Sequence, residues 1–386
     1  MTDGTTTSSP PHGATDPAGG EERAYQAGVR FFLGPLLKLL DDETVSEIMV
    51  NGPRDVYVER GGRIEKTDAS FEDEHALLAA ANNIAQYVGK SISHENPLLD
   101  GRLPDGSRVC IVLHPVAAHG TSINIRRYLK QAVTGEFLLE KNAITPEALE
   151  FLTLAVKGAQ NIIVSGGTGS GKTTLLNILS GAFDDAERIV VIEDTRELQI
   201  QKRHVVQMEA RPQDAYGRGE ITIRDLFVTA LRMRPDRIVV GEVRRGEALD
   251  MIQAMTSGHR GSLCTLHADT PSLACSRLET MCMMADIGLP LAALRRQVAL
   301  ALDLVVQSAR LHSGRRLITH ISEVELDEAA NTYQLHDIYA LDTSAAEPVL
   351  SWTGRRPRLA DELGWKGLTG EIALTEKLFA AGRGAS

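Results

Sequence analysis

The pattern of hydrophobic and polar residues changes about one third of the way along the chain. Over residues 25–130, short strand-like runs alternate with turns, and two segments carry apolar residues at helical spacing. The strand-like runs are Glu47–Asn51, Val56–Glu59, Arg108–Leu113 and Ser122–Tyr128, and the helical segments cover residues 25–40 and 72–88. This pattern predicts a small α+β domain.

From residue 143 to residue 343, nearly unbroken apolar runs alternate with segments of helical periodicity. Such runs are typical of parallel strands that are buried on both faces, with helices as connections. The predicted strands are Asn161–Ser165, Arg188–Ile192, Arg237–Val240, Ser262–Leu266, Asp303–Gln307, Ile318–Glu325 and Tyr333–Leu341, and the helices lie near residues 172–183, 222–232 and 246–257. We therefore predict an α/β domain, joined to the first domain by a polar linker over residues 131–142.

The two ends of the chain lack these patterns. Residues 1–24 have no large apolar side chain after Met1, so they cannot bury enough surface to offset their ordering entropy. We expect this tail to be disordered. Residues 344–386 are rich in turn-forming residues, and their pattern does not predict where they lie in the fold.

Composition narrows the class of protein. Of the 386 residues, 43% are hydrophobic and 24% are charged, which is typical of folded globular domains. The longest apolar run is about ten residues, near Phe31–Leu40, whereas a membrane span needs roughly 20. The start of the chain has no basic and apolar leader, and its four cysteines form no CxxC pair. These features predict a cytoplasmic protein with reduced thiols.

One glycine-rich segment carries a complete nucleotide-binding motif, G-x-x-x-x-G-K-[ST], between an apolar strand and an amphipathic helix. Its glycines let successive backbone N–H groups surround a phosphate, and the helix N-terminus adds a positive dipole end. Lys172 is predicted to reach the β- and γ-phosphates of ATP, and Thr173 to bind Mg²⁺ through its hydroxyl. The predicted nucleotide-binding residues are Gly166, Gly167, Thr168, Gly169, Ser170, Gly171, Lys172, Thr173 and Thr174.

Two acidic residues follow predicted strands whose carboxyl ends face the same ligand crevice. Glu242 is the candidate to orient or deprotonate the attacking water. Glu193 is the candidate to share metal or water positioning with Glu242. The alternatives are an ordinary strand-end ion pair between Glu242 and Arg244, and a turn-capping role for Asp194.

A histidine and two arginines complete the candidate set. His267 follows the strand Ser262–Leu266 and is a candidate to sense the γ-phosphate, with a structural role as the alternative. Strand alternation places Arg126 on the polar face of Ser122–Tyr128. A guanidinium there suits a phosphate, because its planar fork binds two oxygens. Arg108 is the second such candidate, and ordinary surface positions are the alternative for both arginines.

Together these motifs resemble those of the type II/type IV secretion ATPase superfamily. The segments similar to its Walker A, Asp-box, Walker B and His-box motifs are Gly166–Thr173, Ile192–Leu198, Leu231–Arg244 and Gly258–Ala268. The segments that resemble the N-terminal domain of its Tad/Flp-pilus branch are Ser46–Ile64, Pro97–Val109 and Ser122–Tyr128. The resemblance covers roughly residues 30–343 in order and spacing.

The resemblance implies a RecA-like P-loop ATPase motor domain preceded by a smaller, PAS-like α+β domain, with six chains in a ring. It implies ATP hydrolysis with Mg²⁺ at the cytoplasmic face of the membrane, to which the protein is peripheral. This activity would power Tad/Flp-type pilus assembly or protein secretion through polytopic membrane proteins. Glycine at the Walker B aspartate position is usual in the family, which favours Glu242, and the match also favours His267. In the family, arginines matching Arg108 and Arg126 close over ATP.

Other classes of protein make different predictions. A RecA-like motor on nucleic acid, as in conjugative DNA transfer or a helicase, needs a basic stripe or stacking aromatics. Aromatic residues are only 4% of the chain and the net charge is −10, so we expect no direct nucleic-acid partner. A scaffold that binds ATP without hydrolysing it would have lost catalytic residues, and none is missing here. The paired-CxxC insert of the general-secretion and pilus-extension branches is absent, which disfavours those branches.

Overall fold

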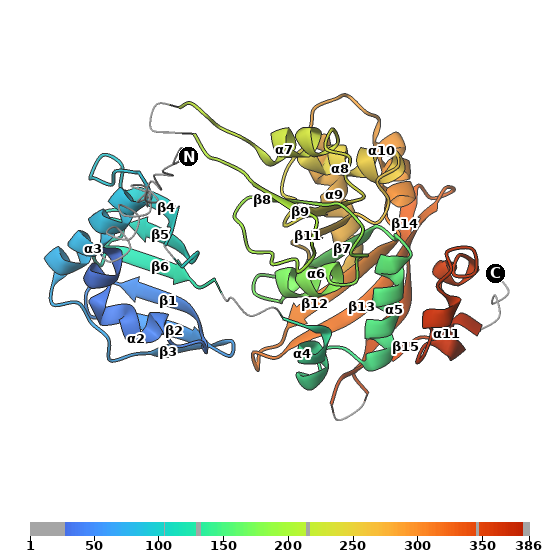
Figure 1. The fold of residues 1–386 in the computed structure, drawn as a ribbon, viewed down its shortest axis with the longest axis horizontal. Helices are drawn as coiled ribbons and strands as arrows, with labels where there is room; N and C mark the ends of the chain where they lie inside the picture. The colour runs from blue at the N-terminus through green and yellow to red at the C-terminus, as the bar shows by residue number, and fades with distance from the viewer. Residues whose placement is uncertain (1–27, 104, 129–132, 214–216, 345–346, 381–386) are drawn as a thin grey trace, which may run out of the picture. The chain divides into compact units, whose positions relative to one another are not determined.

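The computed structural model describes residues 28–103, 105–128, 133–213, 217–344 and 347–380 (Figure 1). The chain divides into two compact units, Met1–Lys130 and Gln131–Ser386. The tail predicted to be disordered, 1–24, lies outside the described residues.

The first unit is built on a six-stranded antiparallel sheet in the order β3-β2-β1-β6-β5-β4. Its strands are β1 (Val45–Asn51), β2 (Val56–Arg60), β3 (Arg63–Lys66), β4 (Leu98–Arg102), β5 (Arg108–Val112) and β6 (Ser122–Arg126). Helix α3 (Glu74–Tyr87) is capped at its N-terminus by Asp73, whose side chain accepts a hydrogen bond from the Ala76 N–H. Alternate strand residues such as Ile123 and Ile125 are fully buried in one core with the apolar face of α3.

The predicted helix over residues 25–40 is interrupted. Residues 28–32 are helical, and a 3₁₀ turn, η1 (Gly34–Leu36), separates them from α2 (Leu37–Leu40). Pro35 lies in the first turn after the break, where its missing N–H costs no helical hydrogen bond. The apolar stripe is nevertheless preserved, since Val29, Leu33, Leu36 and Leu40 are all buried.

The second unit is built on a nine-stranded sheet in the order β15-β14-β13-β12-β7-β11-β10-β8-β9. The strands from β12 to β9 in this order are parallel, and β13, β14 and β15 are antiparallel. The strands are β7 (Ile162–Gly166), β8 (Ile189–Glu193), β9 (Val205–Glu209), β10 (Arg237–Val240), β11 (Leu263–Leu266), β12 (Leu304–Arg310), β13 (Arg316–Asp327), β14 (Thr332–Asp342) and β15 (Val349–Trp352). The seven strands predicted from apolar runs in this unit are all confirmed.

Helices cover both faces of this sheet, as the buried runs predict. The helices are α4 (Gly135–Glu140), α5 (Pro146–Lys157), α6 (Lys172–Ser180), α7 (Ile223–Ala230), α8 (Glu247–Thr256), α9 (Pro271–Met283), α10 (Leu291–Ala301) and α11 (Glu376–Ala380). Ile162 and Val164 of β7 contribute to a core with α5 and α6, whereas Ile163 contributes to a core with α7, α8, α9 and α10. Because β7, β8, β10, β11 and β12 are parallel, their carboxyl ends lie at one edge of the sheet, and the loops discussed below follow these ends.

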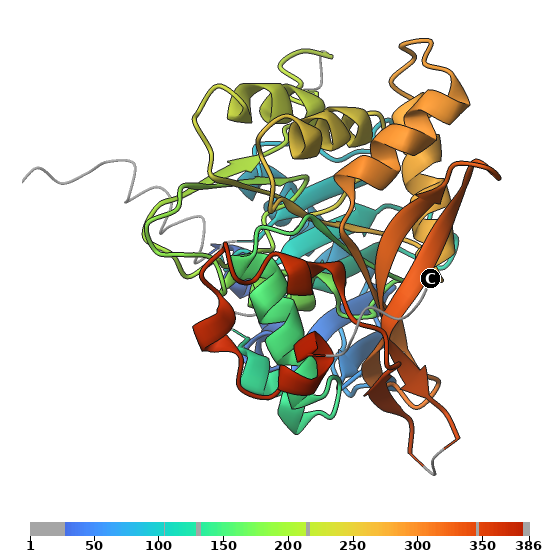
Figure 2. The ribbon, with the colours of Figure 1, turned by 90° about the vertical axis from the view of Figure 1, so that its right-hand side faces the viewer.

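Two segments differ from the sequence expectations. The stretch 131–142, expected to be a polar linker, contains α4, whose Leu138 is buried in the core of the second unit. Residues 349–352 form β15 at the edge of the sheet, and Figure 2 shows the following C-terminal segment beside α5. Leu359, Leu363 and Phe379 of that segment are buried in the same core as α5, which the turn-rich pattern did not indicate.

Candidate nucleotide-binding site

The glycine-rich motif forms the turn between β7 and α6, at the carboxyl end of the parallel strands. Gly166 allows a close approach of the neighbouring strand, because a Cβ there would lie 2.4 Å from the Ser308 carbonyl oxygen. Ser170 is also buried in this turn, and its hydroxyl lies 2.8 Å from that of Ser308. The strand, turn and helix therefore have the arrangement that a phosphate loop requires.

Lys172 is buried at the first position of α6 and points back over the loop. Its Nζ donates hydrogen bonds to the carbonyl oxygens of Gly166 at 3.1 Å and Gly167 at 2.9 Å. It also lies 3.3 Å from Nδ1 of His267. The ammonium group is thus held at the mouth of the loop, where a bound phosphate would meet it.

His267 connects Lys172 to Glu242. Its Nε2 lies 2.8 Å from Oε1 of Glu242, on the other side of the ring from Lys172. Burial and the nearby Lys172 ammonium lower the pKa of His267, so the ring is neutral near pH 7. Because Lys172 has only protons to donate, Nδ1 accepts, and Nε2 carries the hydrogen that Glu242 receives.

Arg244 joins Glu242 to the other acidic strand end. Its guanidinium lies 2.5 Å from Oε2 of Glu242 and 2.8 Å from Oδ2 of Asp194. The ion pair considered as an alternative for Glu242 is therefore present, together with the contact to His267. The Asp194 carboxylate is thus engaged in an ion pair with Arg244.

Glu193 ends β8 and is only 3% exposed. Its Oε1 accepts hydrogen bonds from the N–H groups of Glu197 at 2.8 Å and Leu198 at 2.9 Å, and no donor from the described residues reaches Oε2. Burial is the main cause that raises the pKa of Glu193 to about 7. Gly241 makes room for this carboxylate, since a Cβ there would lie 2.9 Å from Cγ of Glu193.

Arg108 and Arg126 belong to the first unit. They face each other across β5 and β6, and Arg126 also faces Glu47 of β1. Arg108 forms a two-point ion pair with Asp100, with distances of 3.1 and 2.6 Å. The structure thus brings the two predicted arginines together on the polar face of one sheet.

The structure adds residues that the motifs did not indicate. Three further side chains lie against the phosphate loop: those of Ser308 and Arg310 in β12 and that of Arg316 in β13. Their only sequence signal is a strand end, which many residues share, so spacing alone did not identify them.

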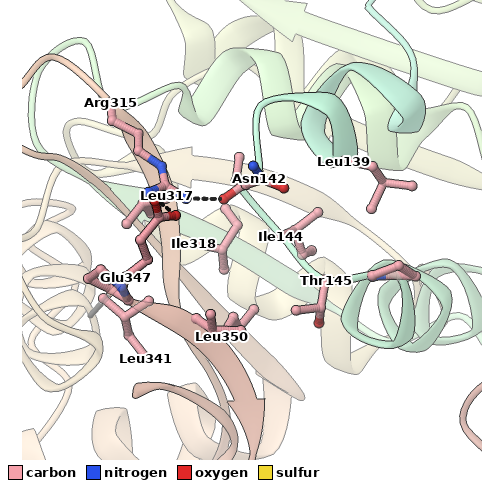
Figure 3. A pocket seen from close by; sticks show the side chains of 14 residues that line it. Leu139, Asn142, Ile144, Thr145, Arg315, Leu317, Ile318, Leu341, Glu347 and Leu350 are labelled. Carbon is pink, nitrogen blue, oxygen red and sulfur yellow. Dashed lines mark hydrogen bonds and ion pairs between the residues drawn. The ribbon is translucent and has the colours of Figure 1, made fainter. Parts of the chain in front are cut away.

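A cavity of about 320 Å³ lies elsewhere in the second unit (Figure 3). Its walls include Leu139, Ile144, Leu317 and Leu350, with Arg315 at one edge. None of the predicted site residues lines this cavity, so its volume does not mark the nucleotide site.

Comparison with known proteins agrees with this arrangement. Residues 32–344 match the family model described as "Type II/IV secretion system protein". The type IV secretion system protein VirB11 of Brucella suis is 34% identical over 330 residues, covering 78% of this chain and 91% of VirB11. A putative conjugal transfer protein of Mycobacterium tuberculosis is 36% identical over 295 residues, covering 75% and 83%. The solved structure of the Legionella pneumophila ATPase DotB is similar with a TM-score of 0.53 at 20% identity, covering 78% of this chain and 82% of DotB.

The chain therefore belongs to the type II/IV secretion system protein family. Its fold is the expected one: a RecA-like P-loop domain preceded by a smaller α+β domain. Over the described residues, no helix combines the length and the hydrophobicity that crossing a membrane requires.

Proposed function

We propose that this protein is a hexameric ATPase that powers Tad/Flp-type pilus assembly or protein secretion from the cytoplasmic face of the membrane. The observation that carries the proposal is the linked set of Lys172, His267 and Glu242 beside the phosphate loop. Family membership supports a secretion-system ATPase of the VirB11 type. The sequence resemblance to the Tad/Flp branch supports the choice of machinery.

The residues present fit Mg²⁺ and ATP by their chemistry. Successive loop N–H groups and Lys172 suit phosphate oxygens, and Thr173 in the first turn of α6 offers a hydroxyl oxygen. Glu193 has a buried oxygen that no described donor satisfies, and carboxylate and hydroxyl oxygens are the ligands that Mg²⁺ takes. When bound, the ion would neutralise charge on the β- and γ-phosphates.

Within this proposal the side chains have different tasks. Lys172 binds the phosphates, and Glu242 takes up the proton of the attacking water or holds that water in line. His267 is neutral and forms hydrogen bonds with both Lys172 and Glu242. A shift of Lys172 would therefore move the imidazole ring and, through it, the carboxylate of Glu242. Glu193 keeps the segment after β8 in place and assists metal or water positioning. Arg108 and Arg126 are proposed to close over the nucleotide in the assembled ring, as the family resemblance implies.

The test of the chemistry is the substitution Glu242→Gln. Glutamine keeps the size and polarity of the side chain but cannot take up a proton. ATP should therefore bind with unchanged affinity and persist unhydrolysed, with kcat reduced by about 10²–10⁴, the usual contribution of a positioned base. Single-turnover hydrolysis and equilibrium ATP binding measure the two effects separately.

Lys172→Ala is the companion variant, and it should remove ATP hydrolysis while leaving the fold intact, because Lys172 acts on the phosphates. A Glu242→Gln protein with the parent kcat would contradict the assignment of Glu242 and transfer the role to Glu193. A Lys172→Ala protein within twofold of the parent activity would contradict the phosphate-loop assignment.

Partners and assembly need their own measurements. Native mass spectrometry with ATP should show a hexamer. Affinity purification from membranes should recover polytopic membrane proteins of a pilus or secretion machine. Recovery of DNA-processing proteins, with ATP hydrolysis stimulated by single-stranded DNA, would instead favour the nucleic-acid motor.

A further inference from the structure

The hairpin of β12 and β13 forms one wall of the phosphate loop. The Ser308 hydroxyl lies 2.8 Å from that of Ser170 in the loop and donates a hydrogen bond of 3.0 Å to the carbonyl oxygen of Ser165, at the end of β7 before the loop. A guanidinium nitrogen of Arg310 lies 3.2 Å from the position that a Cβ on Gly169 would occupy. The hairpin and the loop are therefore in direct contact on the side away from His267's strand, because β7 lies between β12 and β11.

Arg316 makes the most directed of these contacts. Its Nε donates a hydrogen bond of 2.8 Å to the carbonyl oxygen of Gly169, in the middle of the loop. Its Cδ lies 3.6 Å from the position that a Cβ on Gly171 would occupy, so the side chain follows the outside of the loop. A hydrogen bond from a charged donor is stronger than one between neutral groups.

This contact controls the direction of a peptide group. In a trans peptide the C=O and the next N–H point in opposite directions, so holding the Gly169 oxygen at the hairpin turns the Ser170 N–H away from it. That N–H makes only a long contact, 3.4 Å, with the Gly167 oxygen. Backbone N–H groups of such a loop are what binds the phosphate anion, and a hydrogen bond this long within the loop is easily exchanged for one to a phosphate oxygen.

We propose that Arg316 is a positioning residue for the phosphate loop, which it holds in the phosphate-binding conformation through the Gly169 carbonyl. This inference rests on the proposed function and extends it to a residue outside the four motifs. We expect its effect to be larger for nucleotides that carry a β-phosphate, because the loop N–H groups and Lys172 act together on that phosphate.

Arg315, the preceding residue, provides a matched control. Its guanidinium donates to the carbonyl oxygen of Asn142 at 3.1 Å, at the edge of the cavity lined by Leu317 and Ile318 (Figure 3). Removing Arg315 takes the same charge from the same end of the hairpin without touching the loop.

The experiment is equilibrium binding of ADP and AMP, measured by competition with a fluorescent ADP analogue in the full chain. Arg316→Ala should raise the Kd for ADP about tenfold and change the Kd for AMP less than twofold, since AMP has no β-phosphate. Arg316→Lys should fall between Arg316→Ala and the parent, because lysine keeps the charge but loses the Nε geometry. Arg315→Ala should match the parent for both nucleotides.

Thermal unfolding of each variant checks that the hairpin is intact. Unchanged ADP affinity in Arg316→Ala would overturn the role of Arg316 alone. Equal losses for ADP and AMP, or equal losses in Arg315→Ala, would show a general effect on the hairpin and would also overturn it. A parent protein that binds no ADP would overturn the proposed function, and the role of Arg316 with it.

Discussion

Glu193 carries a carboxyl group that is almost completely buried. It is 3% exposed, and one of its oxygens holds two backbone N–H groups that begin the segment after β8. Burial outweighs these hydrogen bonds and raises its pKa to about 7, from the usual 4.5 of a glutamate. The side chain therefore changes its charge close to neutral pH.

This shift predicts a pH dependence of stability. Since the folded-state pKa lies above the unfolded one, the folded protein binds the proton more tightly between pH 4.5 and 7. The free energy of unfolding should therefore fall across this window as pH rises, by about 3 kcal/mol from this one group. Glu193→Gln, which stays neutral, should lack this fall and gain stability relative to the parent as pH rises. Urea unfolding at pH 5 and pH 8 measures the difference.

Glu376→Gln is the control, because Glu376 is exposed at the start of α11. It should follow the parent at both pH values. A Glu193→Gln protein whose difference from the parent is the same at pH 5 and pH 8 would contradict the buried, shifted carboxyl.

At the scale of secondary-structure elements, the C-terminal segment stabilises α5 from outside the sheet. Leu359 is 2% exposed, and its Cδ1 lies 2.9 Å from the position that a Cβ on Gly158 would occupy, at the end of α5. Glu150 of α5 accepts hydrogen bonds from the N–H groups of Ala373, Leu374 and Thr375. Side-chain packing and backbone hydrogen bonds thus both join this segment to the core.

We expect Leu359→Ala to lower the free energy of unfolding by about 2–5 kcal/mol, because it leaves a cavity in that core. Leu374→Ala in the same segment should cost less than about 0.5 kcal/mol, since that side chain is 54% exposed. Trp352 and Trp365, the two tryptophans of the chain, both lie in or near this segment, so their fluorescence reports its unfolding in urea. Equal costs for the two leucine substitutions would contradict the packing described here.

At the scale of the whole molecule, the proposed mechanism divides the work between the two units. Arg108 and Arg126 lie together on a sheet of the first unit, whereas the phosphate loop belongs to the second. An arginine that acts only when the two units close over ATP contributes to the transition state more than to ATP binding. Such a closure in each subunit of a ring would convert hydrolysis into movement.

Arg126→Ala should therefore bind ATP almost as the parent does and hydrolyse it 10²–10³-fold more slowly. That loss corresponds to about 2.7–4 kcal/mol of transition-state stabilisation, the usual effect of removing one preorganised donor. The measurement is ATP affinity and kcat at protein concentrations high enough for the parent to form the proposed hexamer. An unchanged kcat would refute this role, and reduced affinity with an intact kcat would limit Arg126 to ground-state binding.

The sequence by itself determined the features that local physics controls. Glycine spacing between an apolar strand and a helix located the phosphate loop, and apolar runs located β7, β8, β10 and β11. The same runs placed Glu193, Glu242 and His267 at strand ends, because parallel strands of one sheet end at a common edge. These inferences depend only on the local sequence pattern and on the assumption that the strands belong to one sheet.

Only the tertiary structure decided which side chains meet at that edge. Arg244, which the sequence offers as a partner of Glu242, also binds Asp194, and Arg316 reaches Gly169 across 147 positions of the sequence. The C-terminal segment has too few periodic apolar residues to predict an element, yet its Leu359, Leu363 and Phe379 are buried because they pack in the same core as α5. Contacts of this kind depend on how strands are ordered and how helices cover them, and that order is a property of the whole sheet.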